Sequence, residues 1–368
     1  MKKPPRASGW FRSCSCRTIS FLSLALLAIA LGLALGLGFG LTREHSNGSN
    51  SASQNVTIPT VYPPANGSFW QPSGNISWQI VLENPIELNS SSASISPNVD
   101  VFDIDLFTNS ETVLQSLHRL GKKVICYFSA GSFEPDRPDS SQFQSSDMGN
   151  DLSGWPGERW LNISSTNVRN IMAARIQLAA QKGCDGIDPD NVDGYVSTSS
   201  FNIHFPHPQS FGSKSSRTRS SISNLSRFLQ LTWTQQNANG LGLTANDSVA
   251  FMVFLSSTAQ GYNLSIGLKN ALDILPTLSG EVQFAVNEQC VQYDECSSLA
   301  PIIQAGKPVF HIEYVSGDMQ GTDTASGSAV RKACSDSDLS TVLKNQNLDG
   351  WVEYCNGYTA TTPEVSDS

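Results

Sequence analysis

The sequence lacks the short motifs that mark several large enzyme classes. It contains no HExxH, no GxxxxGKS/T and no GxSxG, and only five of its 368 residues are histidine. The glycine run Gly36-Leu-Gly38-Phe-Gly40 lies within an apolar segment and is therefore not a phosphate-binding loop. No residues show zinc-ligand spacing and no segment forms a basic face, so we expect no metal, no cofactor and no nucleic-acid partner.

Charge is absent from one long segment near the N-terminus. Residues 19–41 are mostly apolar and uncharged, and as a helix these 23 residues would span roughly 34 Å, enough to cross a bilayer. Basic residues are more frequent before this segment than after it, which predicts a cytoplasmic tail at 1–18 and a membrane anchor at 19–41. A cleaved signal peptide is the alternative, but its apolar region spans about 7–15 residues. The prediction is a single-pass type II membrane protein whose main domain lies at the cell surface.

The part of the chain after the anchor has the features of an exported glycoprotein. Nine asparagines fit the N-x-S/T sequon, all of them after residue 41: Asn47, Asn55, Asn66, Asn75, Asn89, Asn162, Asn224, Asn246 and Asn263. All 32 acidic residues but only 18 of the 23 basic residues also follow the anchor, so this part has a net charge near −14. An acidic surface attracts a cationic ligand, although a merely solvated surface is the alternative interpretation.

Six cysteines follow the anchor, an even number that permits disulfides in an oxidising compartment. The short spacing between Cys290 and Cys296 makes them the first predicted pair, and Cys334–Cys355 is the second. Two further cysteines, at positions 126 and 184, fall in or beside predicted core strands, and we interpret them as buried thiols.

The remainder of the exported part has the pattern of an α/β domain. Residues 42–69 are rich in Ser, Asn, Thr and Pro, which is typical of a stalk. Eight short apolar segments predict strands at 78–82, 101–106, 124–129, 186–188, 264–268, 282–286, 309–314 and 350–354. Helical patterns lie at 110–120, 167–182, 244–260, 270–278, 293–304 and 338–345. This alternation predicts a (β/α)8 TIM barrel or a doubly wound sheet, and only the first connection, 83–97, shows no helix.

Polar side chains follow most of the predicted strands. The candidates are Asp103, Asp105, Tyr127, Arg137, Asp188, Asp190, Asn191, Asp193, Lys269, Asn270, Asn287, Glu288, Gln289 and Glu313. Any one of them is most simply a solvated loop residue, but in parallel barrels the C-terminal strand ends meet and form the active site. Cleavage of a glycosidic bond needs such a set, because one carboxylic acid protonates the leaving oxygen while a second carboxylate attacks carbon or activates water.

Several segments together resemble glycoside hydrolase family 114. They are Trp70-Gln-Pro72, Asp103-Ile-Asp105, residues 124–137, Trp155-Pro-Gly-Glu158, residues 183–194, Gly267-Leu-Lys-Asn270, Asn287-Glu-Gln-Cys290 and Glu313-Tyr314. The resemblance covers roughly residues 70–357 and implies a TIM barrel with endo-α-1,4-polygalactosaminidase activity. The implied substrate is a polymer of α-1,4-linked galactosamine such as galactosaminogalactan. Its free amines make it cationic, which agrees with the acidic exported part. We therefore predict a hydrolase domain at 70–358 and a disordered tail at 359–368.

The resemblance implies that Asp190 and Glu288 are the catalytic pair, with Asp190 as nucleophile or base and Glu288 as acid; the opposite assignment stays open. Pro189 separates Asp188 from Asp190 and is expected to disturb strand alternation, so either aspartate is a candidate for the cleft. We favour Asp190, with Asp188 as a substrate ligand or structural support. The remaining polar candidates are predicted to bind substrate. A glycosidase of another specificity and an inactive surface carbohydrate-binding barrel are the alternative functions.

Residues 196–235 depart from the family pattern, which runs almost directly from the equivalent of Tyr195 to that of Gln236. The segment is rich in serine and contains four basic residues and no acidic residue. A disordered loop, a lid and a translated intron all account for it, and we favour the intron.

Overall fold

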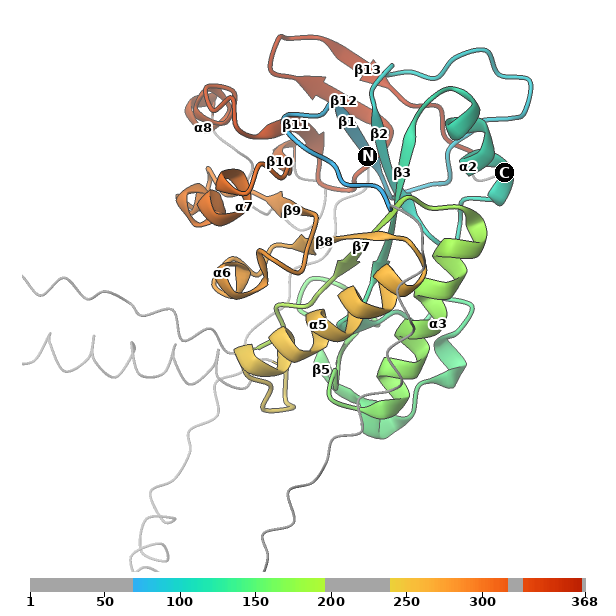
Figure 1. Cartoon of the computed structure of the whole chain (residues 1–368), viewed down its shortest axis with the longest axis vertical. Coiled ribbons are helices and arrows are strands. Elements are labelled where there is room, and N and C mark those ends of the chain that lie inside the picture. The colour runs from blue at the N-terminus through green and yellow to red at the C-terminus, as the bar shows by residue number, and fades with distance from the viewer. Residues whose placement is uncertain (1–68, 196–238, 317–326, 366–368) are drawn as a thin grey trace, which may run out of the picture. The chain divides into compact units, whose positions relative to one another are not determined.

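The computed structural model describes residues 69–195, 239–316 and 327–365 (Figure 1). A ten-stranded sheet forms its centre, in the order β1-β2-β3-β7-β8-β9-β10-β11-β12-β13. The first eight strands in this order are parallel, and β12 and β13 continue the sheet antiparallel. Their bounds are β1 (Trp78–Val81), β2 (Val101–Asp105), β3 (Lys123–Ser129), β7 (Gly186–Asp190), β8 (Ser265–Lys269), β9 (Phe284–Glu288), β10 (Val309–Ser316), β11 (Ser340–Asn345), β12 (Trp351–Tyr354) and β13 (Thr359–Thr361).

Helices connect most of the parallel strands. They are α2 (Glu111–Arg119), α3 (Thr166–Lys182), α5 (Ala245–Gly261), α6 (Leu275–Leu278), α7 (Ala300–Gln304) and α8 (Gly327–Ala333), and α3 and α5 pack side by side (Figure 1). Local sequence explains their ends. Thr244 and Asp247 form the predicted capping box at the start of α5, and Gly183 ends α3 in the left-handed conformation. No helix lies between β1 and β2, as the sequence indicated.

The two faces of the curled sheet carry different side chains. Phe102, Cys126 and Ile187 point toward the helices and belong to the larger apolar cluster. On the opposite face, Ile125 and Phe284 belong to a second apolar cluster near the beginning of the strands. Strand alternation puts the residues two or four positions later on this same interior face. Most of these later residues, such as Tyr127 and Glu288, are polar, so the interior changes from apolar to charged toward the C-terminal strand ends.

Gly267 makes room for a bulky side chain of this interior layer. A Cβ atom at position 267 would lie only 2.3 Å from the ring of Phe284. The absence of a side chain therefore lets Phe284 fill the space beneath Lys269, which follows Gly267 on the same face of β8.

The eighth parallel strand is not the predicted one. Residues 338–345 were expected to form a helix, but Ser340–Asn345 forms β11 and pairs with β10 in parallel register. The predicted strand at 350–354 is instead the antiparallel β12. Long-range contacts outweigh local pattern here, because Trp78 Nε1 on β1 donates to the Ser340 carbonyl at 2.7 Å. The sheet thus curls until β1 and β11 touch, giving a TIM-like arrangement.

Two predicted helices are much shorter than expected. The segment 270–278 is helical only from Leu275, and 293–304 contains a 3-10 turn at Cys296–Leu299 followed by α7. Asn270 and Ala271 have φ values of 49° and 51°, and Asp294 has 58°. An α-helix cannot pass through such left-handed residues, so both helices begin later.

A small antiparallel sheet interrupts the chain between β3 and α3. It has the order β4 (Ser132–Phe133), β6 (Arg159–Leu161), β5 (Met148–Asp151), and the sequence did not predict it. Gly131, at its start, lies so close to the chain after β7 that a Cβ atom would be 1.7 Å from the Asn191 carbonyl oxygen. The small sheet is therefore packed directly against the end of β7.

Three disulfides connect the described cysteines. Cys290–Cys296 and Cys334–Cys355 are the predicted pairs. Cys126 and Cys184 also form a disulfide, so their interpretation as buried thiols is wrong. Sequence spacing could not show this pair, because its members are 58 residues apart and are brought together by the pairing of β3 with β7.

Several predictions concern residues outside the described part. These are the tail, the anchor, nearly all of the stalk, the whole insert at 196–235, and four of the sequons, Asn47, Asn55, Asn66 and Asn224. In the described residues, no helix has the length and apolar character needed to cross a membrane. The tail predicted to be disordered from residue 359 instead begins with β13, which pairs with β12.

Candidate active site

Lys269 lies between the two predicted catalytic carboxylates. Its Nζ is 3.3 Å from Asp190 Oδ2 and 3.2 Å from Glu288 Oε2. The three residues end the neighbouring strands β7, β8 and β9. The Lys269 side chain is only 2% exposed, against 19% for Asp190 and 22% for Glu288. Both carboxylates therefore reach solvent, while the cation that joins them is buried.

Glu288 is held by three donors. Besides Lys269, it accepts hydrogen bonds from Asn270 Nδ2 at 3.0 Å and from the Tyr314 hydroxyl. Burial alone would raise its pKa, but the Lys269 charge and the two hydrogen bonds lower the pKa of Glu288 below its usual value. Its backbone N–H also donates to Asn270 Oδ1 at 2.9 Å, so Asn270 fixes both ends of the residue.

Asp190 has a similar set of partners. The Tyr127 hydroxyl donates to its Oδ2 at 3.0 Å, and the backbone N–H of Asn191 donates to its Oδ1 at 2.7 Å. Burial and the nearby carboxylates raise the pKa of Tyr127 and of Tyr314 far above the usual tyrosine value. Both tyrosines are therefore neutral hydrogen-bond donors at physiological pH.

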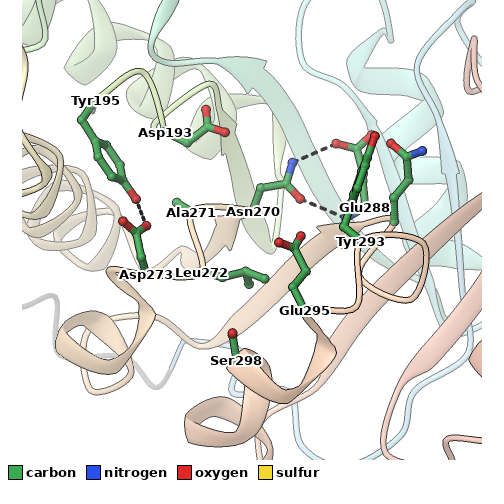
Figure 2. Close-up of a pocket in the computed structure, with 11 residues that line it drawn as sticks. Asp193, Tyr195, Asn270, Ala271, Leu272, Asp273, Glu288, Tyr293, Glu295 and Ser298 are labelled. Carbon is green, nitrogen blue, oxygen red and sulfur yellow. Dashed lines mark hydrogen bonds between the residues drawn. The ribbon is translucent and has the colours of Figure 1, made fainter. Parts of the chain in front are cut away.

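A cavity of about 570 Å³ opens beside Glu288 (Figure 2). The residues that line it are Asp193, Tyr195, Asn270, Ala271, Leu272, Asp273, Glu288, Gln289, Tyr293, Glu295 and Ser298. Four of them are carboxylates, and none of these described lining residues is lysine or arginine. Tyr293 is 58% exposed at the rim, where a flat ring suits stacking against a sugar.

Two of the lining carboxyls hold their protons more tightly than usual. Confinement in the cavity, together with the negative charge of Asp190, raises the pKa of Asp193 to about 6. Burial alone raises the pKa of Glu295. Tyr195 donates a hydrogen bond to Asp273 across the cavity wall (Figure 2). The cavity thus places two carboxyls with raised pKa values close to Glu288.

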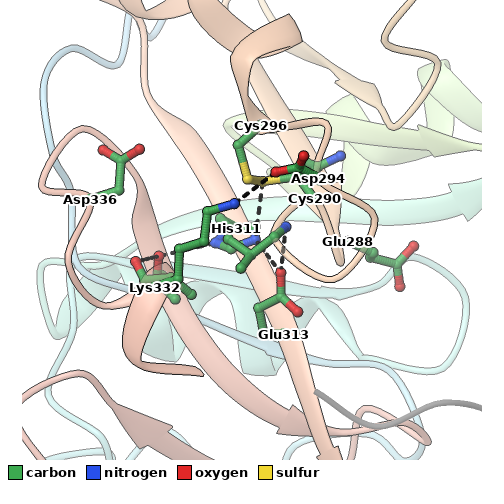
Figure 3. The surroundings of a disulfide bond; sticks show 12 residues. Glu288, Cys290, Asp294, Cys296, His311, Glu313, Lys332 and Asp336 are labelled. Atoms are coloured by element: carbon green, nitrogen blue, oxygen red, sulfur yellow. Dashed lines mark hydrogen bonds and ion pairs between the residues drawn. A yellow bond between two sulfur atoms is a disulfide. The ribbon is translucent and has the colours of Figure 1, made fainter. Parts of the chain in front are cut away.

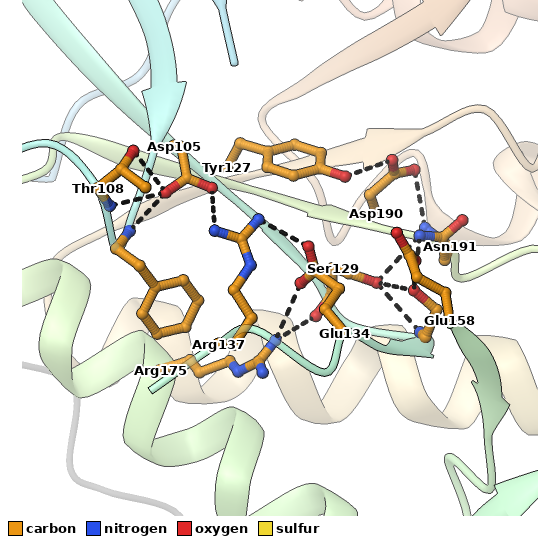
Figure 4. Close-up of polar contacts among 12 residues, drawn as sticks. Asp105, Thr108, Tyr127, Ser129, Glu134, Arg137, Glu158, Arg175, Asp190 and Asn191 are labelled. Carbon is orange, nitrogen blue, oxygen red and sulfur yellow. Dashed lines mark hydrogen bonds and ion pairs between the residues drawn. The ribbon is translucent and has the colours of Figure 1, made fainter. Parts of the chain in front are cut away.

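Asp105 and Arg137 do not line the cavity. Arg137 pairs with Asp105 at 2.6 Å and with Glu134 at 2.7 Å (Figure 4). Asp105 also accepts hydrogen bonds from the backbone N–H groups of Phe107 and Thr108. These contacts use the charges within the protein, so the structure gives this pair a supporting position behind the site.

Glu158 is a site residue to which sequence reasoning assigns no role. It accepts a hydrogen bond from Ser132 at 2.8 Å, and Asn191 donates to the same serine hydroxyl at 3.2 Å (Figure 4). Burial raises the pKa of Glu158 to about 7; the Ser132 hydrogen bond opposes this, and the charges of Glu134 and Asp190 add to it. Its place in the Trp155-Pro-Gly-Glu158 segment is the signal that would have identified it.

Asp103 and Asp188 lie buried on the interior face below the catalytic pair. Both are fully inaccessible, and no described residue donates a hydrogen bond to either carboxylate. The expectation that Pro189 disturbs strand alternation is wrong, since β7 pairs with β3 without interruption from Gly186 to Asp190. Asp188 therefore points to the same face as Asp190, one layer deeper, and does not reach the cavity.

Glu313 and Asn287 also miss the cavity. Alternation along β10 turns Glu313 away from the interior face that Tyr314 occupies. Glu313 is fully buried, accepts from the Val291 N–H at 2.9 Å and lies 3.1 Å from His311 Nε2 (Figure 3). Asn287 is buried beside Asn270. The same alternation identifies Tyr314 as the catalytic-face residue of this pair.

One group of metal-ligand side chains is present among the described residues. Cys290, Cys296 and His311 lie within 4.8 Å of one another (Figure 3). Cys290 and Cys296 are joined in a disulfide, which leaves no thiolate to bind an ion.

Comparison with known proteins identifies a family and several similar structures. The model of glycoside-hydrolase family GH114 matches residues 60–360. The crystal structure of Aspergillus fumigatus Ega3 in complex with galactosamine is 44% identical, with 78% of this chain and 98% of that chain covered and a TM-score of 0.61. The glycoside hydrolase domain of PelA from Pseudomonas aeruginosa is 12% identical, with coverages of 78% and 99% and a TM-score of 0.47. No curated protein matches the chain.

Proposed function

Because the chain belongs to glycoside hydrolase family 114, we propose that it is an endo-acting hydrolase of α-1,4-linked galactosamine polymers such as galactosaminogalactan. The observation that carries the proposal is the pair Asp190 and Glu288, held on either side of Lys269, with Glu288 lining an acidic cavity. The 44% identical structure that contains galactosamine supports an aminosugar substrate.

The spacing of the two carboxylates favours retention of anomeric configuration. Both oxygens lie within 3.3 Å of the same Nζ, so they are at most roughly 6.5 Å apart. Retaining glycosidases hold their carboxyl groups about 5–5.5 Å apart, whereas inverting enzymes need room for a water between them. One carboxylate then attacks the anomeric carbon and the other protonates the departing oxygen.

We assign Asp190 as the nucleophile and Glu288 as the acid, since Glu288 lines the cavity into which a leaving sugar would depart. The lowered pKa of Glu288 means that a bound substrate must weaken its contact with Lys269 before it carries a proton. An activated aryl glycoside tests the roles, because it needs no protonation to leave. Glu288→Gln should cleave it and Asp190→Asn should not; the reverse result exchanges the two roles.

Recognition of the substrate is proposed to depend on its amines. Four carboxylates line the cavity, and a galactosamine residue with a free amine is a cation. N-acetylation removes that charge, so fully acetylated polymer should be a poor substrate.

The direct test is digestion of deacetylated and fully acetylated α-1,4-galactosamine polymers, with reducing ends counted and product lengths measured. Release of intermediate oligomers from the deacetylated polymer alone is the expected result. Binding without new reducing ends would favour an inactive carbohydrate-binding protein, and cleavage of only the acetylated polymer would favour a glycosidase of another specificity. The double variant Asp190→Asn/Glu288→Gln is the matched control.

We further propose that the eight parallel strands close as a (β/α)8 barrel, and that residues 19–41 anchor this domain outside the cell. Contacts of Trp78 with Ser340 and of Leu82 with Leu348 support the closure. Asn75, Asn89, Asn246 and Asn263 are exposed, as glycosylated asparagines must be, while Asn162 is half-buried. A mass decrease on deglycosylation and protease sensitivity of the domain on intact cells are the expected results.

The insert at 196–235 is proposed to be dispensable. The described residues that flank it are close together, because Asn239 donates a hydrogen bond to the Gly194 carbonyl. Tyr195, also beside the gap, lines the cavity. Joining Tyr195 to Gln236 should therefore preserve the fold and the activity. Loss of activity in a folded deletion variant would show that the segment takes part in catalysis.

A further inference from the structure

Two carboxyl groups lie in the interior with no donor to satisfy them. Asp103 on β2 and Asp188 on β7 are both completely buried, and β3 separates their strands. None of their four oxygens accepts a hydrogen bond from any described residue. An isolated buried carboxylate is very costly, and two adjacent ones would also repel each other. The arrangement is stable only if one group keeps its proton and donates it to the other.

The charges around the pair agree with this state. Burial and the nearby Asp188 raise the pKa of Asp103 well above its usual value. Burial likewise raises the pKa of Asp188 to about 7, against the opposing charge of Lys269. The charged groups that face the pair are Lys269 from β8, Asp190 from β7 and Glu288 from β9. Tyr127 on β3 is neutral.

We propose that Asp103 and Asp188 hold one proton between them, and that the single negative charge of this pair positions Lys269 between Asp190 and Glu288. The inference rests on the proposed function of that site. Lys269 interacts with three carboxylates, Asp188 below it and Asp190 and Glu288 above. The single negative charge of the Asp103–Asp188 pair below Lys269 balances the attraction of Asp190 and Glu288 above it. A second would draw the ammonium group down, away from the catalytic carboxylates. Asp103 and Asp188 are thus positioning residues that act through Lys269.

This arrangement predicts the alkaline side of the pH–activity profile. Loss of the shared proton puts two negative charges beneath Lys269, so kcat should fall with rising pH while KM changes little. Asp103→Asn supplies an amide donor that cannot lose its proton. Its kcat should stay within about threefold of wild type at pH 7, and one pH unit beyond the wild-type decline it should exceed wild type about tenfold.

Asp103→Val is the contrasting variant, since it has a similar size and no donor. It leaves Asp188 without a partner, and kcat should fall about 100-fold at every pH. Rescue by Asn but not by Val separates a donor role from simple packing. An Asp103→Asn profile parallel to that of wild type would overturn the positioning role.

Infrared spectroscopy tests the shared proton without any substrate. At pH 8, where carboxyls with a pKa of about 6 or 7 are mostly ionised, wild type should still show the carbonyl band of one protonated buried carboxyl. Asp103→Asn should lack this band. Asp100→Asn, the same change at an exposed position just before β2, should retain it.

The outcomes separate this inference from the proposed function. Absence of the band in wild type, or its persistence in Asp103→Asn, would overturn the shared proton whatever the enzyme cleaves. If Asp103→Asn does not fold, Asp188→Asn removes the pair from the other side and should abolish the same band. Failure of the wild-type enzyme to cleave galactosamine polymer would refute the proposed function and leave the infrared result standing.

Discussion

Two buried lysines show how the partners of a charge decide its use. Lys269 and Lys344 are 2% and 0% exposed. Lys269 contacts carboxylates, and although burial opposes its charge, Asp190 and Glu288 raise the pKa of Lys269 well above the ordinary value. Lys344 instead donates to neutral oxygens: Gln79 Oε1 at 3.2 Å and the carbonyls of Asp349 at 2.5 Å and Trp351 at 2.6 Å. Burial lowers the pKa of Lys344 to about 7.

The difference is one of role as well as protonation. Lys269 is a cation that contacts the two proposed catalytic carboxylates and lowers the pKa of Glu288. Lys344 is a three-way hydrogen-bond donor where β1, β11 and β12 meet, and its charge is a burden to the fold. The same side chain at the same depth therefore serves chemistry in one place and architecture in the other.

Removing Asp190 and Glu288 should narrow the difference in pKa, because Lys269 would keep only the negative charge beneath it. In the double variant Asp190→Asn/Glu288→Gln, Lys269 keeps only neutral neighbours at the mouth of the site, so its pKa should fall toward that of Lys344. Turnover should fall about 10⁴-fold for each single substitution. Activity assays and NMR titration of isotope-labelled lysine side chains measure the two effects. A folded single variant with near-wild-type activity would remove that residue from the catalytic pair.

Substituting each lysine should separate the roles directly. Lys269→Met should lower kcat about 10²–10³-fold, because Asp190 and Glu288 lose the cation between them. Lys344→Met should keep kcat near wild type but lose about 1–3 kcal/mol of unfolding free energy, since three buried oxygens lose their donor. Parallel kinetics and urea unfolding of the two variants are the measurement. Equal losses of activity in both would contradict the division of roles.

The pH dependence of stability should belong to Lys344. Its pKa is about 7 in the folded protein and 10.5 ordinarily, so between these values the unfolded chain binds more protons. Rising pH then favours folding, by up to about 1.4 kcal/mol per pH unit, and this gain is lost as the pH falls toward 7. Lys344→Met should lack the rise between pH 7 and 10. Wild-type and Lys344→Met stabilities that run parallel across this window would show that Lys344 keeps its proton.

Salt should have the smallest effect. It should change substrate recognition by the acidic cavity and leave the stability contributed by Lys344 nearly unchanged. If carboxylates of the cavity recognise amines, KM for the deacetylated polymer should rise about threefold between low salt and roughly 0.5 M, where screening is strong. The hydrogen bonds of Lys344 involve neutral oxygens, so thermal stability should change little. A KM that does not depend on salt would count against recognition by charge.

The sequence predicted which polar residues meet at one edge of the sheet, because the signals for their positions are local. Asp190, Lys269 and Glu288 each end an apolar strand, and parallel strands bring such ends together. The residues whose structure or position was predicted wrongly depend on long-range contacts, which a local sequence pattern cannot show. The polar residues of β11, including Lys344, hide a strand whose stability comes from β10 and β1. Glu313 was predicted to bind substrate, but its side chain points away from the interior face of β10. Side chains alternate along a strand, so the adjacent Tyr314 is the residue that points to the interior.

Other features could not be predicted for the same physical reason. The three-stranded sheet after β3 has short strands with no regular apolar alternation, and its place is set by packing against Asn191. The partnership of Asp103 with Asp188 requires both the curl of the sheet and the register of three strands.

The Cys126–Cys184 disulfide makes the chain tolerant of cleavage at one place. It encloses the small antiparallel sheet and α3 in a loop of 58 residues, whose closure stabilises the fold by about 4 kcal/mol in a chain-entropy model. A protease that cut this loop after Tyr127 would produce two polypeptides, one containing Tyr127 and the other containing Asp190. The disulfide would keep them covalently joined next to those two residues. The nicked protein would therefore migrate as one species until a reductant was added.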